Sequence, residues 1–173
     1  MLYLGDLEQF VAAIPASGPY HSYYHGFVHL LNGDLSTARH NLNQAFTDFP
    51  SDMFGSLSRA LLAHLVDDDR LAIEMVRQVA SGRERLPLRD GEVSYKQAQL
   101  LALAGDNLEA LATLEQTIDQ GFFCSICFLS DPALRGIQDN PRFEQLMERA
   151  TARQRAFGLQ FGLPIEVGTA GLH

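Results

Sequence analysis

The sequence predicts an all-α fold in which helices pack as successive antiparallel pairs. Two apolar helical segments end in the dipeptide Gly-Asp, at residues 33–34 and 105–106, and each dipeptide is followed four residues later by an alanine. Together with Ala72 between them, these alanines stand 34 and 38 residues apart. Recurrence at this spacing indicates two-helix units, each of which buries its apolar face against the next unit.

The composition is that of a globular chain with an acidic surface. Its 173 residues are 46% hydrophobic, and they carry a formal net charge of −8 with a pI near 5.1. This charge repels phosphate backbones, so it disfavours direct nucleic-acid binding by this segment. Because the chain has neither a run of about 18 apolar residues nor a signal peptide, we expect no membrane span and a cytoplasmic location. A periplasmic location stays open if a parent protein is anchored in the membrane.

Three helix pairs can be placed in order, over residues 19–52, 53–86 and 91–122. Small residues on facing ridges allow two helices to approach closely, and Gly33 and Gly105 suit turns that need a positive φ. The residues that define the register of the units are Gly26, Ala38, Ala45 and Pro50 in the first unit, Ala60 and Ala72 in the second, and Ala98, Leu101, Ala110 and Leu114 in the third.

This register resembles the tetratricopeptide repeat (TPR), a helix-turn-helix module of 34 residues. The resemblance implies a TPR-like right-handed superhelix of antiparallel helix pairs that binds protein partners and needs no cofactor. Residues 5–15 resemble the second helix of a further unit whose first helix is missing. We therefore expect the chain to be a piece of a longer protein, with residues 1–157 forming the helical repeat domain.

The C-terminal part has a different signature. Asp131 before Pro132 and Asn140 before Pro141 are each an N-cap followed by a first-turn proline, so each predicts a helix start. The closing helices are expected over residues 131–157, with Gly158 as a stop. Residues 128–150 resemble the closing segment of repeat arrays in bacterial signalling proteins, namely winged-helix transcription regulators, serine/threonine kinases and nucleotide cyclases. The matching residues are Asp131, Pro132, Leu134, Pro141, Arg142, Phe143 and Leu146.

The last residues, 158–173, are predicted to leave the array as an extended apolar tail. Apolar residues alternate with small or polar ones in FGLQFGLPIEV, which is a period of two and not the helical period of 3.6. We expect this tail to cover apolar surface of its own chain or of a second copy, which makes a homodimer possible.

The TPR resemblance also implies a binding groove on the inner face, formed by the first helix of each unit. In this sequence the groove positions are mainly aromatic and apolar and include no lysine or arginine, so they favour an apolar helix or extended peptide over a terminal carboxylate. Burial of the same residues against neighbouring helices is the alternative. The peptide-binding positions are Tyr20, Tyr23, Phe27, Leu30 and Leu31, then Phe54, Leu57, Leu61, His64 and Leu65, then Glu92, Tyr95, Gln99, Ala102 and Leu103.

Two other groups of residues suggest a different chemistry, a metal-binding or redox sensor or enzyme. His21, His25 and His29 are spaced by four, but at about 1.5 Å of rise per residue the outer two lie about 12 Å apart and cannot share one metal. We interpret them as packing and surface residues. Cys124 and Cys127 form a single C-x-x-C, which we interpret as small side chains in a buried segment. The sequence thus favours a non-catalytic protein-protein interaction module.

Overall fold

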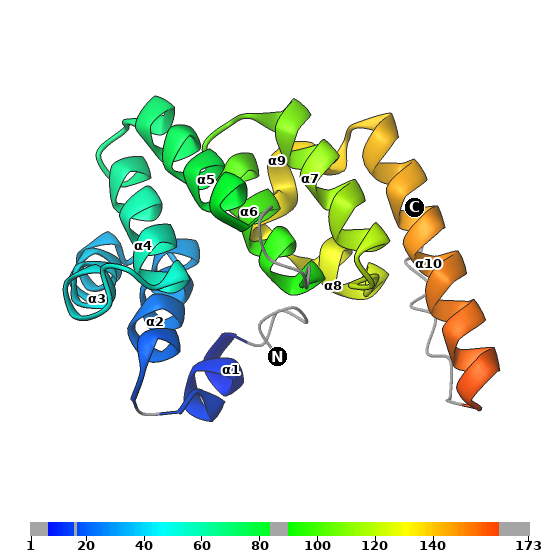
Figure 1. Ribbon diagram of the computed structural model, residues 1–173, viewed down its shortest axis with the longest axis horizontal. Coiled ribbons are helices and arrows are strands. Elements are labelled where there is room, and N and C mark those ends of the chain that lie inside the picture. The colour runs from blue at the N-terminus through cyan, green and yellow to red at the C-terminus, as the bar shows by residue number, and fades with distance from the viewer. Residues whose placement is uncertain (1–6, 16, 84–89, 163–173) are drawn as a thin grey trace.

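The computed structural model describes residues 7–15, 17–83 and 90–162, which form helices and connections without a strand (Figure 1). The array contains α1 (Leu7–Ala13), α2 (Pro19–Leu31), α3 (Leu35–Asp48), α4 (Met53–His64), α5 (Asp69–Arg83), α6 (Gly91–Leu103) and α7 (Asn107–Asp119). The C-terminal elements are α8 (Ser125–Ser130), the 3-10 helix η2 (Pro132–Leu134), α9 (Arg135–Gln138) and α10 (Pro141–Phe161).

Successive helices pack in pairs, α2 with α3, α4 with α5, and α6 with α7. Each pair also contacts the next, through α3 with α4 and through α5 with α6. Figure 1 shows the pairs following one another across the molecule, from α2 and α3 to α7. The predicted all-α architecture of consecutive helix pairs is therefore confirmed. Every described helix is also too short or too polar to cross a bilayer.

Small side chains bring the paired helices close together. A Cβ added to Gly26 in α2 would lie 2.6 Å from Cγ of Leu42 in α3, well inside van der Waals contact. The alanines predicted at the matching positions are all buried, namely Ala38, Ala45, Ala60, Ala72, Ala98 and Ala110. Close approach of the helices leaves no space for larger residues there, because protein cores are packed to high density.

The three pairs turn in the same way but with different residues. Gly33 and Gly105 have φ angles of 79° and 81°, as expected, whereas Asp67 holds the same turn in the second pair with φ of 59°. The next residue in each turn is an aspartate that caps the second helix. Asp34, for example, accepts a hydrogen bond from the Thr37 amide at 3.1 Å. A side chain in the left-handed region is strained, so Asp67 costs stability that glycine does not.

The C-terminal elements fold back onto the third pair. The caps predicted at Asp131 and Asn140 are present, because their carboxylate and amide oxygens each accept a backbone N–H, from Ala133 and Arg142, at 2.9 Å. The short helix α8 was not expected. Both η2 and α9 pack on α6, while α10 packs on α7 and α8.

The end of α10 corrects one prediction. Gly158 does not stop the helix, which continues to Phe161 and ends at Gly162 in the left-handed conformation, with φ of 62°. Residues 158–161 are therefore helical and do not form an extended tail. Residues 163–173, the rest of the predicted tail, lie outside the described residues. At the other end of the chain, α1 lies against α2, where the rings of Phe10 and Tyr24 are 5.0 Å apart.

Candidate functional site

Most residues predicted for the inner groove are covered within the chain. The fully or nearly fully buried ones are Tyr23, Phe27, Phe54, Leu57, Leu61, Tyr95, Gln99 and Ala102. Leu30, Leu31, His64, Leu65, Glu92 and Leu103 are partly buried. Tyr20 alone among the predicted groove residues is largely exposed, at 50%. The structure thus favours the alternative that these positions pack against neighbouring segments, and leaves Tyr20 as the accessible part of the predicted surface.

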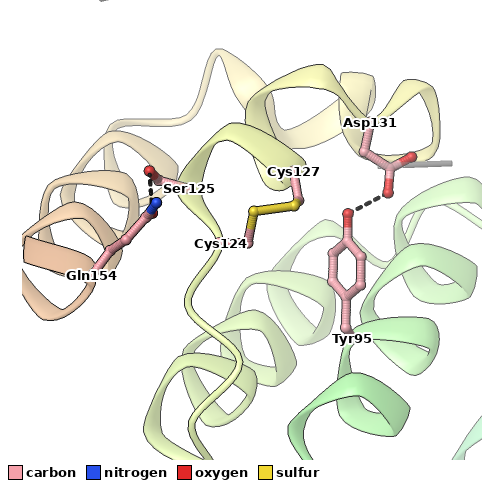
Figure 2. Close-up of a disulfide and its surroundings, with 6 residues drawn as sticks. All are labelled: Tyr95, Cys124, Ser125, Cys127, Asp131 and Gln154. Carbon is pink, nitrogen blue, oxygen red and sulfur yellow. Dashed lines mark hydrogen bonds between the residues drawn. A yellow bond between two sulfur atoms is a disulfide. The ribbon is translucent and has the colours of Figure 1, made fainter. Parts of the chain in front are cut away.

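The third unit of the groove is occupied by the chain's own Asp131-Pro132 turn. Tyr95 Oη and Gln99 Nε2 both donate hydrogen bonds to Oδ2 of Asp131, the second at a distance of 2.6 Å. The other carboxylate oxygen caps η2. Figure 2 shows the Tyr95 ring pointing from α6 toward the Asp131 carboxylate. The two residues predicted to hold a partner peptide therefore hold a polypeptide turn of the same molecule.

A buried lysine, which is not one of the predicted groove positions, lies beside this turn. Lys96 is only 2% exposed, and its Nζ lies 3.4 Å from Glu92 Oε1 and 4.4 Å from the centre of the Tyr24 ring. Burial lowers the pKa of Lys96 to about 8, although the carboxylates of Glu92 and Asp131 act in the opposite direction. The inner face between α2 and α6 is thus partly polar.

The buried tyrosines differ in their hydrogen bonding. Within the described residues, Tyr23 Oη finds no hydrogen-bond partner, whereas Tyr95 donates to Asp131. Burial raises the pKa of both phenols well above its ordinary value, and the Asp131 carboxylate acts in the same direction. A phenol that stays neutral at physiological pH keeps its O–H, so Tyr95 can donate a hydrogen bond to the Asp131 carboxylate.

The accessible part of the inner face is aromatic. The ring of Tyr20, at the start of α2, lies 4.6 Å from the ring of Phe54 at the start of α4. Tyr23 packs on the same phenylalanine, with ring centres 5.1 Å apart. These helices therefore present one half-exposed ring on a rigid aromatic base, an arrangement that favours contact with an apolar group.

The three histidines of α2 are half-buried and not arranged around a common point. The rings of His21 and His25 lie 4.3 Å apart, and His29 Nδ1 is 3.3 Å from Asp34 Oδ2. Burial lowers the pKa of His25, and the electrostatic influence of the neighbouring His21 and His29 rings adds to this effect. No group of three His, Cys, Asp or Glu side chains in the described part of the chain could hold a metal ion.

The two cysteines form a disulfide (Figure 2), so they are not simply the small buried side chains that the sequence suggested. Cys127 lies in the first turn of α8 and is 8% exposed, while Cys124 directly before the helix is half-buried. The bond links residues only three positions apart, and a crosslink that closes so short a loop stabilises a fold by about 2 kcal/mol in the chain-entropy model.

No family model matches the chain, and neither the curated proteins nor the solved structures gave a significant match. Function therefore has to be inferred from the residues of this molecule themselves.

Sequence reasoning missed two features of the inner face. Asp131 was predicted only as a cap, because nothing in the sequence shows that its turn reaches Tyr95 and Gln99. Lys96 is the only lysine of the chain, and this is the one sequence signal that could have drawn attention to it. Lysine is rarely fully buried unless it has a partner.

Proposed function

We propose that this chain is a non-catalytic, TPR-like helical repeat module that binds a protein partner. The observation that supports this most directly is the capture of the Asp131-Pro132 turn by Tyr95 and Gln99. A face of α6 that holds a polypeptide turn of its own chain has the donors and the shape that polypeptide binding requires. Binding of helices and extended peptides by such faces is a recurring mode of recognition.

The partner is expected at the beginning of α2 and α4, because the third unit is already filled. Tyr20 is half-exposed there and rests on the buried Phe54 ring. A rigid tyrosine provides a large contact area at low entropic cost, so it is a favourable anchor for an apolar side chain. We propose an apolar helix or extended peptide as the ligand, and another domain of the same parent protein is one source of it.

The proposed setting is a cytoplasmic bacterial signalling or transcription-regulatory protein. It rests on the resemblance of residues 128–150 to closing segments of TPR arrays in such proteins. The helix starts that this motif implies are supported by the caps at Asp131 and Asn140, since each side chain accepts the backbone N–H two residues further on.

Site-specific photo-crosslinking tests the binding proposal. A photoreactive phenylalanine replaces Tyr20 in one variant and Leu108 in the other, since Leu108 is 76% exposed on α7 and away from the inner face. We expect a specific crosslinked protein from position 20 and none from position 108. Equal labelling from both positions, or none from either, contradicts the proposal.

The purified partner then allows a quantitative test. Tyr20→Ala should weaken its affinity about tenfold or more, which is typical for truncation of an anchoring tyrosine. Leu108→Ala should leave the affinity unchanged, and circular dichroism should show the same helix content for both variants. If Tyr20→Ala binds the partner with unchanged affinity, the surface around Tyr20 is not the binding site.

A further inference from the structure

The disulfide joins two residues of one short segment and does not connect separate elements. Cys124 and Cys127 are three positions apart, with their Cα atoms 5.2 Å from each other. Reduced cysteines at this separation stay within reach of each other, because the first turn of α8 fixes their spacing. The pair can therefore open and close without rearrangement of the helical array.

The C-terminal elements are held in place by other contacts. Asp131, at the end of α8, is bound by Tyr95 and Gln99. At the start of the same helix, Ser125 Oγ donates to Gln154 Oε1 of α10 at 3.3 Å. Stabilisation by a disulfide decreases as the closed loop becomes shorter, so this crosslink is at the low end of the stabilising range and is not the only contact that holds the C-terminal elements.

The two cysteines differ in residue burial, which influences which sulfur a thiolate attacks. Exchange begins with attack of an outside thiolate on the more accessible sulfur of the pair, and the other sulfur leaves as a thiolate. Cys124 is half-buried and lies in the connection between α7 and α8. Cys127 is 8% exposed. We therefore assign Cys124, the less buried residue of the two, as the site of attack, and Cys127 as the leaving and resolving group.

We propose that Cys124 and Cys127 form a thiol–disulfide exchange site whose co-reactant is a dithiol. One thiolate of the dithiol attacks Cys124 Sγ, so that a mixed disulfide forms and Cys127 leaves as a thiolate, which takes up a proton. The second thiol of the co-reactant, after losing its proton, attacks its own sulfur in the mixed disulfide and releases Cys124. Two electrons pass to the protein, which gains two thiols, and the co-reactant becomes a disulfide. The reverse sequence reoxidises the protein.

Reduction of the folded protein tests this proposal first. The full chain is equilibrated with mixtures of reduced and oxidised dithiothreitol, free thiols are counted by alkylation and mass measurement, and helix content is followed by circular dichroism. We expect two thiols to appear in molecules that keep their full helix content. Thiols that appear only together with loss of helix content would assign the bond to a structural role and overturn the proposal.

Two matched variants test which sulfur is attacked. In Cys127→Ser the remaining Cys124 should react with a small aromatic disulfide at least about tenfold faster than the remaining Cys127 in Cys124→Ser, because accessibility limits attack. Circular dichroism confirms that both variants are folded. Equal rates in folded variants overturn the assignment of Cys124 as the attacked residue. If either variant fails to fold, the reduction of the unmodified chain still decides whether exchange occurs.

The natural class of co-reactant is tested with the same protein. Reduced glutathione serves as a small reductant with one thiol, and a protein with a reduced C-x-x-C serves as a reductant with two thiols. We expect the protein dithiol to reduce the folded chain faster at equal thiol concentration, because its second thiol resolves the mixed disulfide within the same molecule. If glutathione is equally fast, the preference for a dithiol is wrong.

Discussion

Helices α2 and α6 occupy equivalent places in the first and third pairs, yet their inner faces differ. The fifth residue of each is a fully buried tyrosine, Tyr23 in α2 and Tyr95 in α6. Within the described residues, the first phenol has no hydrogen-bond partner, while the second donates to Asp131. The ninth residues diverge further, because Phe27 is apolar and Gln99 donates to the same carboxylate.

This difference follows from what covers each helix. The Asp131-Pro132 turn lies on α6, and a buried carboxyl group is stable only when hydrogen-bond partners surround it. Aromatic rings cover α2 instead, with Phe54 5.1 Å from Tyr23. Equivalent positions of a repeat therefore keep their burial but change their polarity to suit the neighbouring segment.

Removal of the Asp131 carboxylate should have the largest effect. Asp131→Ala leaves Tyr95 and Gln99 without their acceptor in a buried place, and it also removes the cap of η2. We expect a loss of about 3–5 kcal/mol in the free energy of unfolding, measured by urea denaturation. Asn140→Ala is the control, since it removes a similar cap alone and should cost about 1 kcal/mol. Equal losses in the two variants would show that the buried network adds nothing.

The two tyrosines should respond differently to the same substitution. Tyr95→Phe removes a donor from a buried carboxylate, which should lower the free energy of unfolding by about 2 kcal/mol. Tyr23→Phe removes a buried hydroxyl that lacks a partner among the described residues, so the variant should be as stable as the original or more stable by up to about 1 kcal/mol. Urea titrations of both variants measure the difference, and equal destabilisation would remove the contrast between α2 and α6.

The features that could be predicted from the sequence are those that depend on neighbouring residues of the chain. Small residues such as Gly26, the caps at Asp131 and Asn140, and the positive φ of Gly33 follow from rules that act within a few residues of the chain. The hydrogen bonds from Tyr95 and Gln99 to Asp131 connect residues more than 30 positions apart. No local pattern encodes such a contact, so the groove was predicted as open where the chain itself fills it.

The pH dependence of the free energy of unfolding should depend on Lys96 but not on Tyr24, which occupies the equivalent position of α2. Burial lowers the pKa of Lys96 in the folded chain to about 8 from 10.5, so between these values the unfolded chain binds more protons. The free energy of unfolding should therefore rise with pH, by about 1 kcal/mol from pH 7 to pH 9. Lys96→Met should lose this rise, whereas Tyr24→Phe should keep it. Urea denaturation at several pH values measures both, and identical pH profiles for Lys96→Met and the original chain would contradict the assignment.

The smallest change in the free energy of unfolding is expected at the turns within the three pairs, where the second pair differs from the other two. Gly33 and Gly105 hold the left-handed turn without strain, whereas Asp67 holds it with a side chain. Asp67→Gly should raise the free energy of unfolding by about 0.5 kcal/mol, because relief of the strain exceeds the extra entropy that glycine has in the unfolded chain. Gly33→Ala should lower it by about 1 kcal/mol or more, since the added Cβ has space but meets an unfavourable φ. Thermal and urea unfolding of both variants measure the two shifts, and a destabilised Asp67→Gly would mean that the Asp67 side chain stabilises its turn by more than its conformation costs.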